Sequence, residues 1–426
     1  MKITIKPGKL KGTVTAPPSK SYAHRMLISA AFTDGWSEVS GISSSEDMLA
    51  TLDCLAALGV EYEKTDSRVK IKGIKAQPSD EKGVTPVTET NEETPLAQLP
   101  EFPCRESGST LRFMIPIALA VCGGGRFTGA ERLIERGIGI YEEIFKGCGI
   151  SVEKTNSSIS VSGKLSAGEY KIRGDVSSQF ITGMLFALSL LNGESRIDVL
   201  PPVESRAYID ITIDVLKIFG VHVDEDKENC FTIRGAQNYQ SGNYQVEGDW
   251  SNAAFLYAFN AVGNELEIQG LNENSIQGDK ACVDCFEKLI GKRVDTAEDL
   301  SIDLSGTPDL GPVLFAATAA LRGGYFRGTK RLRIKESDRA QAMAEELQKF
   351  GVKCLVGENE VVVLQSILRK PEVPLNGHND HRIVMALSVL ASLTGAVIEG
   401  AEAVRKSWPE FFEVMKEAGL RADLSE

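Results

Sequence analysis

The stretch SGSTLRFMIPIALA, residues 107–120, opens with small polar residues and continues as an almost unbroken apolar run. This pattern predicts a helix that is buried on all sides, because an exposed helix would carry a polar face. Five further stretches share the pattern: SKSYAHRMLISAA (19–31), VSSQFITGMLFALSLL (176–191), DWSNAAFLYAFNAV (249–262), TPDLGPVLFAATAAL (307–321) and NDHRIVMALSVLAS (379–392). The fold is therefore expected to be built around six buried helices.

A second type of helix alternates with the first. It is amphipathic and ends in a glycine, the residue that best adopts the left-handed conformation at a helix end. The terminal glycines are Gly59, Gly149, Gly220, Gly291, Gly351 and Gly419. Both series recur about every 70 residues, which indicates an internal repeat.

Short strand-like runs, such as SRVKIKGIK, SRIDVL and NELEIQG, lie between the helices. We therefore predict six mixed α and β units, with buried helices surrounded by sheets and outer helices, arranged as two lobes of three units. The first step of the repeat is longer because residues 76–102 are polar, acidic and rich in proline, which predicts an irregular insertion.

Composition narrows the classes of function. The 426 residues carry a formal net charge of −12, which argues against nucleic acid or an anionic membrane as partner. No apolar run approaches the roughly 20 residues that span a bilayer, and the first residues read as a lysine-bearing strand rather than a signal peptide. We expect a cytoplasmic protein whose eight cysteines are reduced and in which neither Cys282 and Cys285 nor His378 and His381 form a metal site.

The starts of the buried helices collect polar groups. The free N–H groups and the dipole at a helix N-terminus attract anions, although each polar side chain could instead only cap its own helix. Capping alone does not explain the cations Lys20 and Arg25 that flank Ser21 at the first of these starts.

Two later stretches strengthen the case for an anion site. GTKRLRIKESDRAQAM (328–343) gathers cations around Glu336, and Ser337 could cap an ordinary surface helix there. NDHR places Arg382 in the first turn of an otherwise apolar helix, where it needs an anion, either Asp380 or a ligand. Asp309 follows a proline at another helix start, and GAERLIERGIG (129–139) and AVRKSWPEFF (403–412) add further cations.

These residues favour an enzyme that binds two phosphorylated or carboxylated small molecules and transfers protons through carboxylates. The sequence has neither a phosphate-binding GxxxxGK[ST] loop nor a GxGxxG fold context, so it indicates no cofactor.

The sequence resembles the 5-enolpyruvylshikimate-3-phosphate synthase family of enolpyruvyl transferases. The stretches that match the motifs of this family, in the same order, are PPSKSYAHR, ESGSTLR, TGAERLIER, GDVSSQF, SRAYIDIT, VEGDWS, TPDLGPV, RIKESDR, NDHR and KSWPEFF. The resemblance implies a two-lobed inside-out α/β barrel of six βαβαββ repeats. It places a lobe for shikimate 3-phosphate at residues 19–245. Residues 1–18 and 246–426 would form the second lobe, which closes over the phosphoenolpyruvate site.

The resemblance also implies the reaction, in which the enolpyruvyl group of phosphoenolpyruvate moves to the 5-hydroxyl of shikimate 3-phosphate and phosphate leaves. No cofactor or metal is implied, and the family suggests a monomer. In this family the inhibitor glyphosate occupies the phosphoenolpyruvate site. The implied catalytic residues are Asp309, Glu336 and Lys20. Those for shikimate 3-phosphate are Lys20, Ser21, Arg25, Ser177, Ser178, Gln179, Ser205, Tyr208, Asp309 and Lys335. Those for phosphoenolpyruvate are Lys20, Gly108, Arg132, Gln179, Arg339, Arg382 and Lys406.

The sequence departs from the family in places. Arg331 stands where many relatives have Asn, and Ser109 where many have Thr. Two alternatives stay open: a UDP-N-acetylglucosamine enolpyruvyl transferase, which usually has Lys-Asn where this chain has Lys20-Ser21, and a non-catalytic anion-binding relative.

Overall fold

The computed structural model describes residues 1–74, 99–291 and 301–425. These residues form two compact units, Met1–Ser19 with Glu247–Glu426, and Lys20–Val246. Each unit has its own hydrophobic core. The predicted insertion at 76–102 lies mostly outside the described residues.

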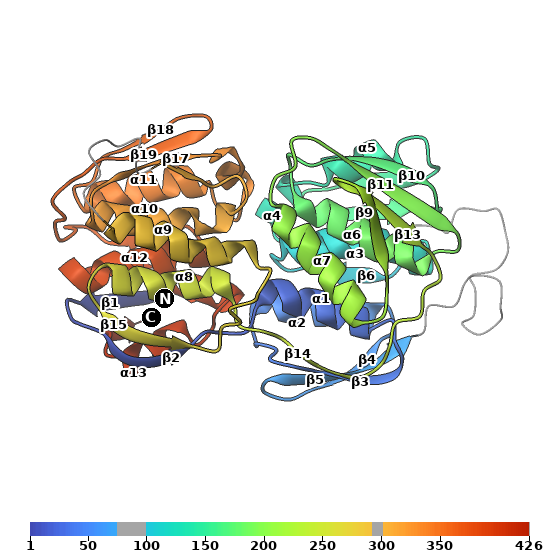
Figure 1. The fold of residues 1–426 in the computed structure, drawn as a ribbon, viewed down its shortest axis with the longest axis horizontal. Helices are drawn as coiled ribbons and strands as arrows, with labels where there is room; N and C mark the ends of the chain where they lie inside the picture. Colours follow the sequence, from blue (N-terminus) through green and yellow to red (C-terminus); the bar gives the residue numbers. More distant parts are fainter. Residues whose placement is uncertain (75–98, 292–300, 426) are drawn as a thin grey trace. The chain divides into compact units, whose positions relative to one another are not determined.

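Six helices are buried on nearly all sides, as the repeat predicted. They are α1 (Lys20–Ala30), α3 (Gly108–Cys122), α6 (Ser178–Leu190), α8 (Trp250–Ala261), α10 (Gly311–Ala320) and α12 (His381–Thr394). In the unit that contains the chain ends, α8, α10 and α12 lie side by side and contact one another (Figure 1).

The six amphipathic helices are also present. They are α2 (Glu46–Ala57), α5 (Gly139–Phe145), α7 (Arg206–Ile218), α9 (Cys282–Ile290), α11 (Arg339–Lys349) and α13 (Phe411–Glu417). Five of the six terminal glycines have the expected positive φ. The expectation is wrong for Gly291, whose φ is −61°, because the chain leaves α9 in an extended conformation.

The described strands form six sheets. In the Lys20–Val246 unit the sheets, in spatial order, are β14 (Asn243–Gln245), β3 (Asp34–Ser40), β5 (Arg68–Ile74) and β4 (Glu61–Lys64); β6 (Glu101–Pro103), β7 (Gly124–Thr128), β9 (Ser158–Ser162) and β8 (Ser151–Lys154); and β10 (Glu169–Arg173), β11 (Glu194–Leu200), β13 (Cys230–Arg234) and β12 (Val223–Lys227).

The other unit has β20 (Leu375–Asn376), β21 (Ala396–Glu399), β1 (Lys2–Lys6) and β22 (Arg421–Ser425); β16 (Ser301–Asp303), β17 (Gly324–Arg327), β19 (Glu360–Val363) and β18 (Cys354–Val356); and β15 (Glu265–Gln269) with β2 (Lys11–Thr15). In every four-stranded sheet one parallel pair is followed by two antiparallel pairs. The repeat is therefore βαβαββ, with strands from distant segments completing some of the sheets.

One part of the predicted irregular stretch is regular. Its last residues belong to β6, which pairs in parallel with β7. The ring of Phe102 is buried and stacks on Phe127 with ring centroids 4.8 Å apart. Tertiary pairing overrides the local preference of a polar, proline-rich sequence here.

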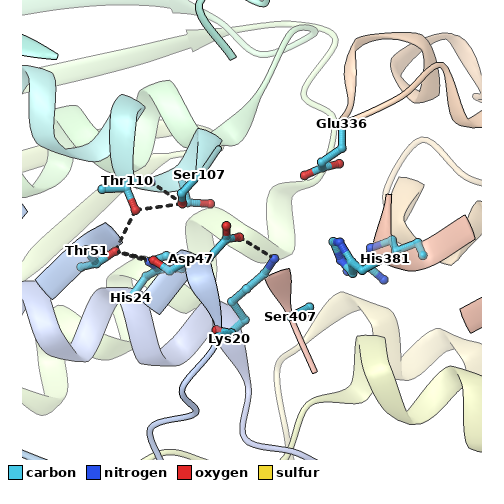
Figure 2. Close-up of polar contacts among 12 residues, drawn as sticks. Lys20, His24, Asp47, Thr51, Ser107, Thr110, Glu336, His381 and Ser407 are labelled. Atoms are coloured by element: carbon cyan, nitrogen blue, oxygen red, sulfur yellow. Dashed lines mark hydrogen bonds and ion pairs between the residues drawn. The ribbon is translucent and has the colours of Figure 1, made fainter. Parts of the chain in front are cut away.

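A buried chain of hydrogen bonds joins α1, α2 and α3. The Nδ1 atom of His24 lies 2.7 Å from Oγ1 of Thr51, which lies 2.8 Å from Oγ1 of Thr110. Thr110 in turn donates to Oγ of Ser107, the N-cap of α3, at 2.8 Å (Figure 2). All four side chains are buried, so the chain fixes the beginning of α3 against the two preceding helices.

None of the helices in the described ranges has the length and apolar character that a bilayer span requires.

We predict that His24 makes the protein sensitive to acid. Burial, with the nearby charges of Lys20 and Arg25, holds the pKa of His24 well below its usual 6.5. Below pH 6.5 the unfolded chain binds a proton that the folded protein does not, so stability should fall as the pH drops, by at most about 1.4 kcal/mol per pH unit.

The test compares apparent melting temperatures at pH 7 and pH 5. His24→Asn should lose less stability over this interval than the wild-type protein, whereas the control His222→Asn, which removes an exposed histidine, should behave like wild type. An equal loss in His24→Asn and wild type would show that His24 does not contribute.

Candidate functional site

Asp309 is surrounded by cations in the unit that contains the chain ends. It lies in the short helix η4 (Pro308–Leu310) that leads into α10. Its carboxylate accepts from Nζ of Lys335 at 3.1 Å, Nη1 of Arg339 at 2.8 Å and Nη2 of Arg382 at 3.1 Å. Burial alone would raise the pKa of Asp309, but these cations hold it well below its usual range. These partners come from segments that are distant in the chain, so the sequence around Asp309 did not reveal them.

Arg339 is the centre of this cluster. Its side chain is 1% exposed, yet it contacts three carboxylates. Besides Asp309, Nη2 lies 2.6 Å from Oε2 of Glu336 and Nε lies 2.8 Å from Oδ2 of Asp380. Burial would lower the pKa of the guanidinium, but the three carboxylates raise it above its usual range. The planar group thus fixes three carboxylates at once.

The anion that Arg382 needs is Asp309, rather than the neighbouring Asp380. One Nη group of Arg382 binds the Asp309 carboxylate and the other donates to the Asp309 carbonyl at 3.1 Å. Asp380 is the N-cap of α12: Oδ1 of its carboxylate accepts from the backbone N–H of Arg382 at 2.9 Å, and Oδ2 accepts from Nε of Arg339 at 2.8 Å.

Ser337 does not cap α11. The N-cap is Asp338, which accepts from the backbone N–H of Gln341, while the Ser337 hydroxyl donates to Asp380 at 3.1 Å. The side chain of Glu336, between η5 (Lys330–Ile334) and α11, is thereby held among the cluster residues. Arg331, in η5, is buried.

Lys335 is the cation of this cluster whose charge is most easily lost. Burial lowers its pKa to about 8, although Asp309 opposes that shift. A small rise in pH above neutrality therefore begins to discharge Lys335.

Lys406 ends η6 (Ala401–Lys406) and is buried. Its Nζ donates to the backbone carbonyl of Asn379 at 2.6 Å, so a loop carbonyl at the start of α12 holds this cation.

In the Lys20–Val246 unit, Lys20 begins α1 and forms an ion pair with Asp47 at 2.8 Å (Figure 2). Both side chains are mostly shielded, at 17% and 13% exposed. A partly desolvated pair of this kind holds the ammonium group in one position.

Arg25 is buried and is held by hydrogen bonds within its own unit. It donates to Thr212 at 2.8 Å, to Thr182 at 3.2 Å and to the backbone carbonyls of Ser21 and Tyr208 at 2.7 and 3.0 Å. Burial lowers its pKa to about 10. Within the described ranges these bonds use four of its five N–H groups and leave one Nη1 hydrogen without an acceptor.

Two arginines that are outside the predicted substrate sets flank Gly108. A Cβ atom at Gly108 would lie 3.1 Å from Nη1 of Arg112 and 3.1 Å from Nη2 of Arg136. Nη1 of Arg112 also donates to Gln179 at 2.6 Å, and Gln179 donates to Ser109 at 2.9 Å. The start of α3 thus combines the positive end of a helix dipole with two guanidinium groups. The spacing of Arg112, one helical turn after Gly108, was the available signal.

Arg132, by contrast, is in α4 (Glu131–Glu135) and its side chain is 49% exposed. It lies 3.9 Å from Glu135, one turn away.

The remaining predicted residues lie at three helix starts. Ser21 is in the first turn of α1. Ser177 is the N-cap of α6 and accepts from the backbone N–H of Gln179 at 3.3 Å, and Ser178 is buried in the first turn. Ser205 is the N-cap of α7 with a left-handed φ of 56°, and Tyr208 follows in its first turn.

Comparison with known proteins identifies relatives of the whole chain. The family model described as EPSP synthase (3-phosphoshikimate 1-carboxyvinyltransferase) matches residues 5–415. A 3-phosphoshikimate 1-carboxyvinyltransferase of Clostridium kluyveri is 38% identical, with 99% of this chain and 98% of the relative covered. One of Clostridium botulinum strain Eklund 17B is 37% identical, with 97% and 96% covered.

Among solved structures, EPSP synthase from Acinetobacter baumannii superposes with a TM-score of 0.77 at 23% identity, covering both chains completely. At that identity the likeness establishes the fold, which agrees with the predicted two-lobed inside-out α/β architecture.

Proposed function

Because the chain belongs to the EPSP synthase family, we propose that it transfers the enolpyruvyl group of phosphoenolpyruvate to the 5-hydroxyl of shikimate 3-phosphate. The products are 5-enolpyruvylshikimate 3-phosphate, which is an intermediate of aromatic amino acid biosynthesis, and phosphate. One observation at the site supports this proposal above all. The carboxylates of Asp309 and Glu336 are both held by the buried guanidinium of Arg339.

The reaction needs a base and an acid. In the addition step, the hydroxyl oxygen attacks C2 of phosphoenolpyruvate while its proton leaves and the methylene carbon gains a proton. The resulting tetrahedral intermediate has a methyl group. In the elimination step this methyl group loses a proton, the double bond re-forms and phosphate departs.

We assign proton removal from the hydroxyl to Asp309 and protonation of the methylene carbon to Glu336, with Lys20 assisting. The low pKa of Asp309 keeps it ionised and so able to accept a proton, although it makes the free carboxylate a weak base. Anionic substrates that neutralise Lys335 and Arg382 would raise its basicity, so the base would become effective only when the substrates are bound.

The substrate sets follow from the same assignment. For shikimate 3-phosphate we propose Lys20, Ser21, Arg25, Ser177, Ser178, Gln179, Ser205, Tyr208, Asp309 and Lys335. For phosphoenolpyruvate we propose Lys20, Gly108, Arg132, Gln179, Arg339, Arg382 and Lys406. Arg112 and Arg136 support an anion next to Gly108, and glyphosate would compete with phosphoenolpyruvate for that place. We also propose that the enzyme is cytoplasmic and monomeric.

The proposal is tested by mixing the protein with shikimate 3-phosphate and phosphoenolpyruvate and measuring phosphate release together with formation of the enol ether. UDP-N-acetylglucosamine serves as the alternative acceptor. Release with that acceptor alone would identify the sister enzyme, and no release with either would indicate a non-catalytic relative.

We predict that Asp309→Asn and Glu336→Gln each lower kcat by more than about 100-fold, the usual scale for acid and base groups. Both variants keep the size of the side chain, so substrate binding should persist and can be measured by titration. The control is Glu358→Gln, an exposed site outside the cluster. Wild-type turnover in either variant would remove that residue from its role.

We predict that shikimate 3-phosphate binds with net uptake of protons near pH 8.5. At that pH Lys335, with a pKa of about 8, is largely neutral, and a bound phosphate would favour its charged form. Affinity should therefore weaken as the pH rises through 8.

Calorimetric titration in buffers of different ionisation enthalpy measures this uptake. Lys335→Arg supplies the control, because arginine stays charged and should bind without that proton. Equal proton uptake by the variant and the wild-type enzyme would place the titrating group elsewhere.

A further inference from the structure

Glu346 is a buried carboxylate outside the substrate sets. It lies in α11, and its side chain is 2% exposed. It accepts from Nζ of Lys349 at 2.8 and 2.9 Å, from Nε2 of His378 at 3.0 Å and from the backbone N–H of Asn376 at 2.9 Å. Two of these three partners belong to the loop 376–380, so Glu346 ties this loop to α11.

The backbone of this loop is unusual. His378 and Asn379 have φ of 49° and 51°, consecutive left-handed conformations that Asn tolerates better than most other residues with a side chain. Such a conformation persists only where surrounding contacts impose it. The contacts here include Glu346 on the ring of His378 and Oδ1 of Asn376, which accepts from the His378 backbone N–H at 2.8 Å.

The far side of the loop holds cations that we assign to phosphoenolpyruvate. The Asn379 carbonyl accepts from Lys406 at 2.6 Å, and the next residue, Asp380, binds Arg339 at 2.8 Å. The direction of the Asn379 carbonyl depends on the two left-handed residues, because another backbone conformation would turn this carbonyl away from Lys406.

We propose that Glu346 and His378 are positioning residues that hold the loop 376–380 in its left-handed conformation and so place Lys406 for phosphoenolpyruvate. The inference rests on the proposed function. Neither residue needs to touch a substrate, since each acts through the loop backbone.

The test measures KM for each substrate in wild type, His378→Ala, His378→Gln and the control Glu345→Gln, which changes an exposed carboxylate on the same helix. His378→Ala should raise the KM for phosphoenolpyruvate about tenfold, less than the roughly 100-fold effect that a 1 Å misplacement can have. The KM for shikimate 3-phosphate should change less than about threefold. His378→Gln keeps an N–H donor and should restore most of the loss, and Glu345→Gln should match wild type.

A second measurement does not depend on turnover. Amide hydrogen exchange across residues 376–382 should become faster in His378→Ala and in Glu346→Gln, and circular dichroism confirms that each variant is folded. The effects of the two substitutions on KM should be less than additive in the double variant, because both break the same contact.

The results separate two failures. Absence of wild-type phosphate release would overturn the proposed function. In an active enzyme, a His378→Ala variant with unchanged KM for phosphoenolpyruvate, or with both KM values raised equally, would overturn the positioning role alone.

Discussion

The guanidinium of Arg339 is the interaction on which the candidate site depends. It is buried, and it contacts Asp309, Glu336 and Asp380, which come from three separate segments. Removing the guanidinium would leave three carboxylates without their common cation. Removing the carboxylates would leave the buried charge of Arg339 unpaired. The arrangement therefore links the starts of α10, α11 and α12, and it orients the two carboxylates to which we assign proton transfer.

The Lys20–Val246 unit also holds a buried arginine, but with other kinds of hydrogen-bond partner. Arg25 is held mainly by threonine hydroxyls and backbone carbonyls rather than by carboxylates. Within the described ranges its hydrogen bonds all go to neutral groups, which suits a residue that we assign to an anionic substrate. Arg112 and Arg136 beside Gly108 add positive charge at the start of α3. Lys20 of the same unit, by contrast, is paired with a carboxylate, that of Asp47.

Most of the fold could be predicted from the sequence. The periodicity of the sequence was enough to locate the twelve repeat helices, because a fully apolar helix and an amphipathic helix each have a recognisable local pattern. Contacts between residues that are distant in the sequence have no such local pattern. The sequence could show that Arg382 needed an anion, but not that Asp309 rather than Asp380 supplies it. Likewise Arg112, Arg136 and Glu346 gained their roles from neighbours that only the folded chain brings close. The left-handed loop at His378 was also unpredictable, since its conformation is imposed by tertiary contacts.

The most direct test of this account is the turnover of Arg339→Lys with shikimate 3-phosphate and phosphoenolpyruvate. Lysine keeps the positive charge but cannot present a planar set of donors to three carboxylates. We predict a fall in kcat/KM of at least about 100-fold in a folded protein, because the proton-transfer groups lose their fixed geometry. Activity within about threefold of wild type would contradict it, since charge alone would then suffice.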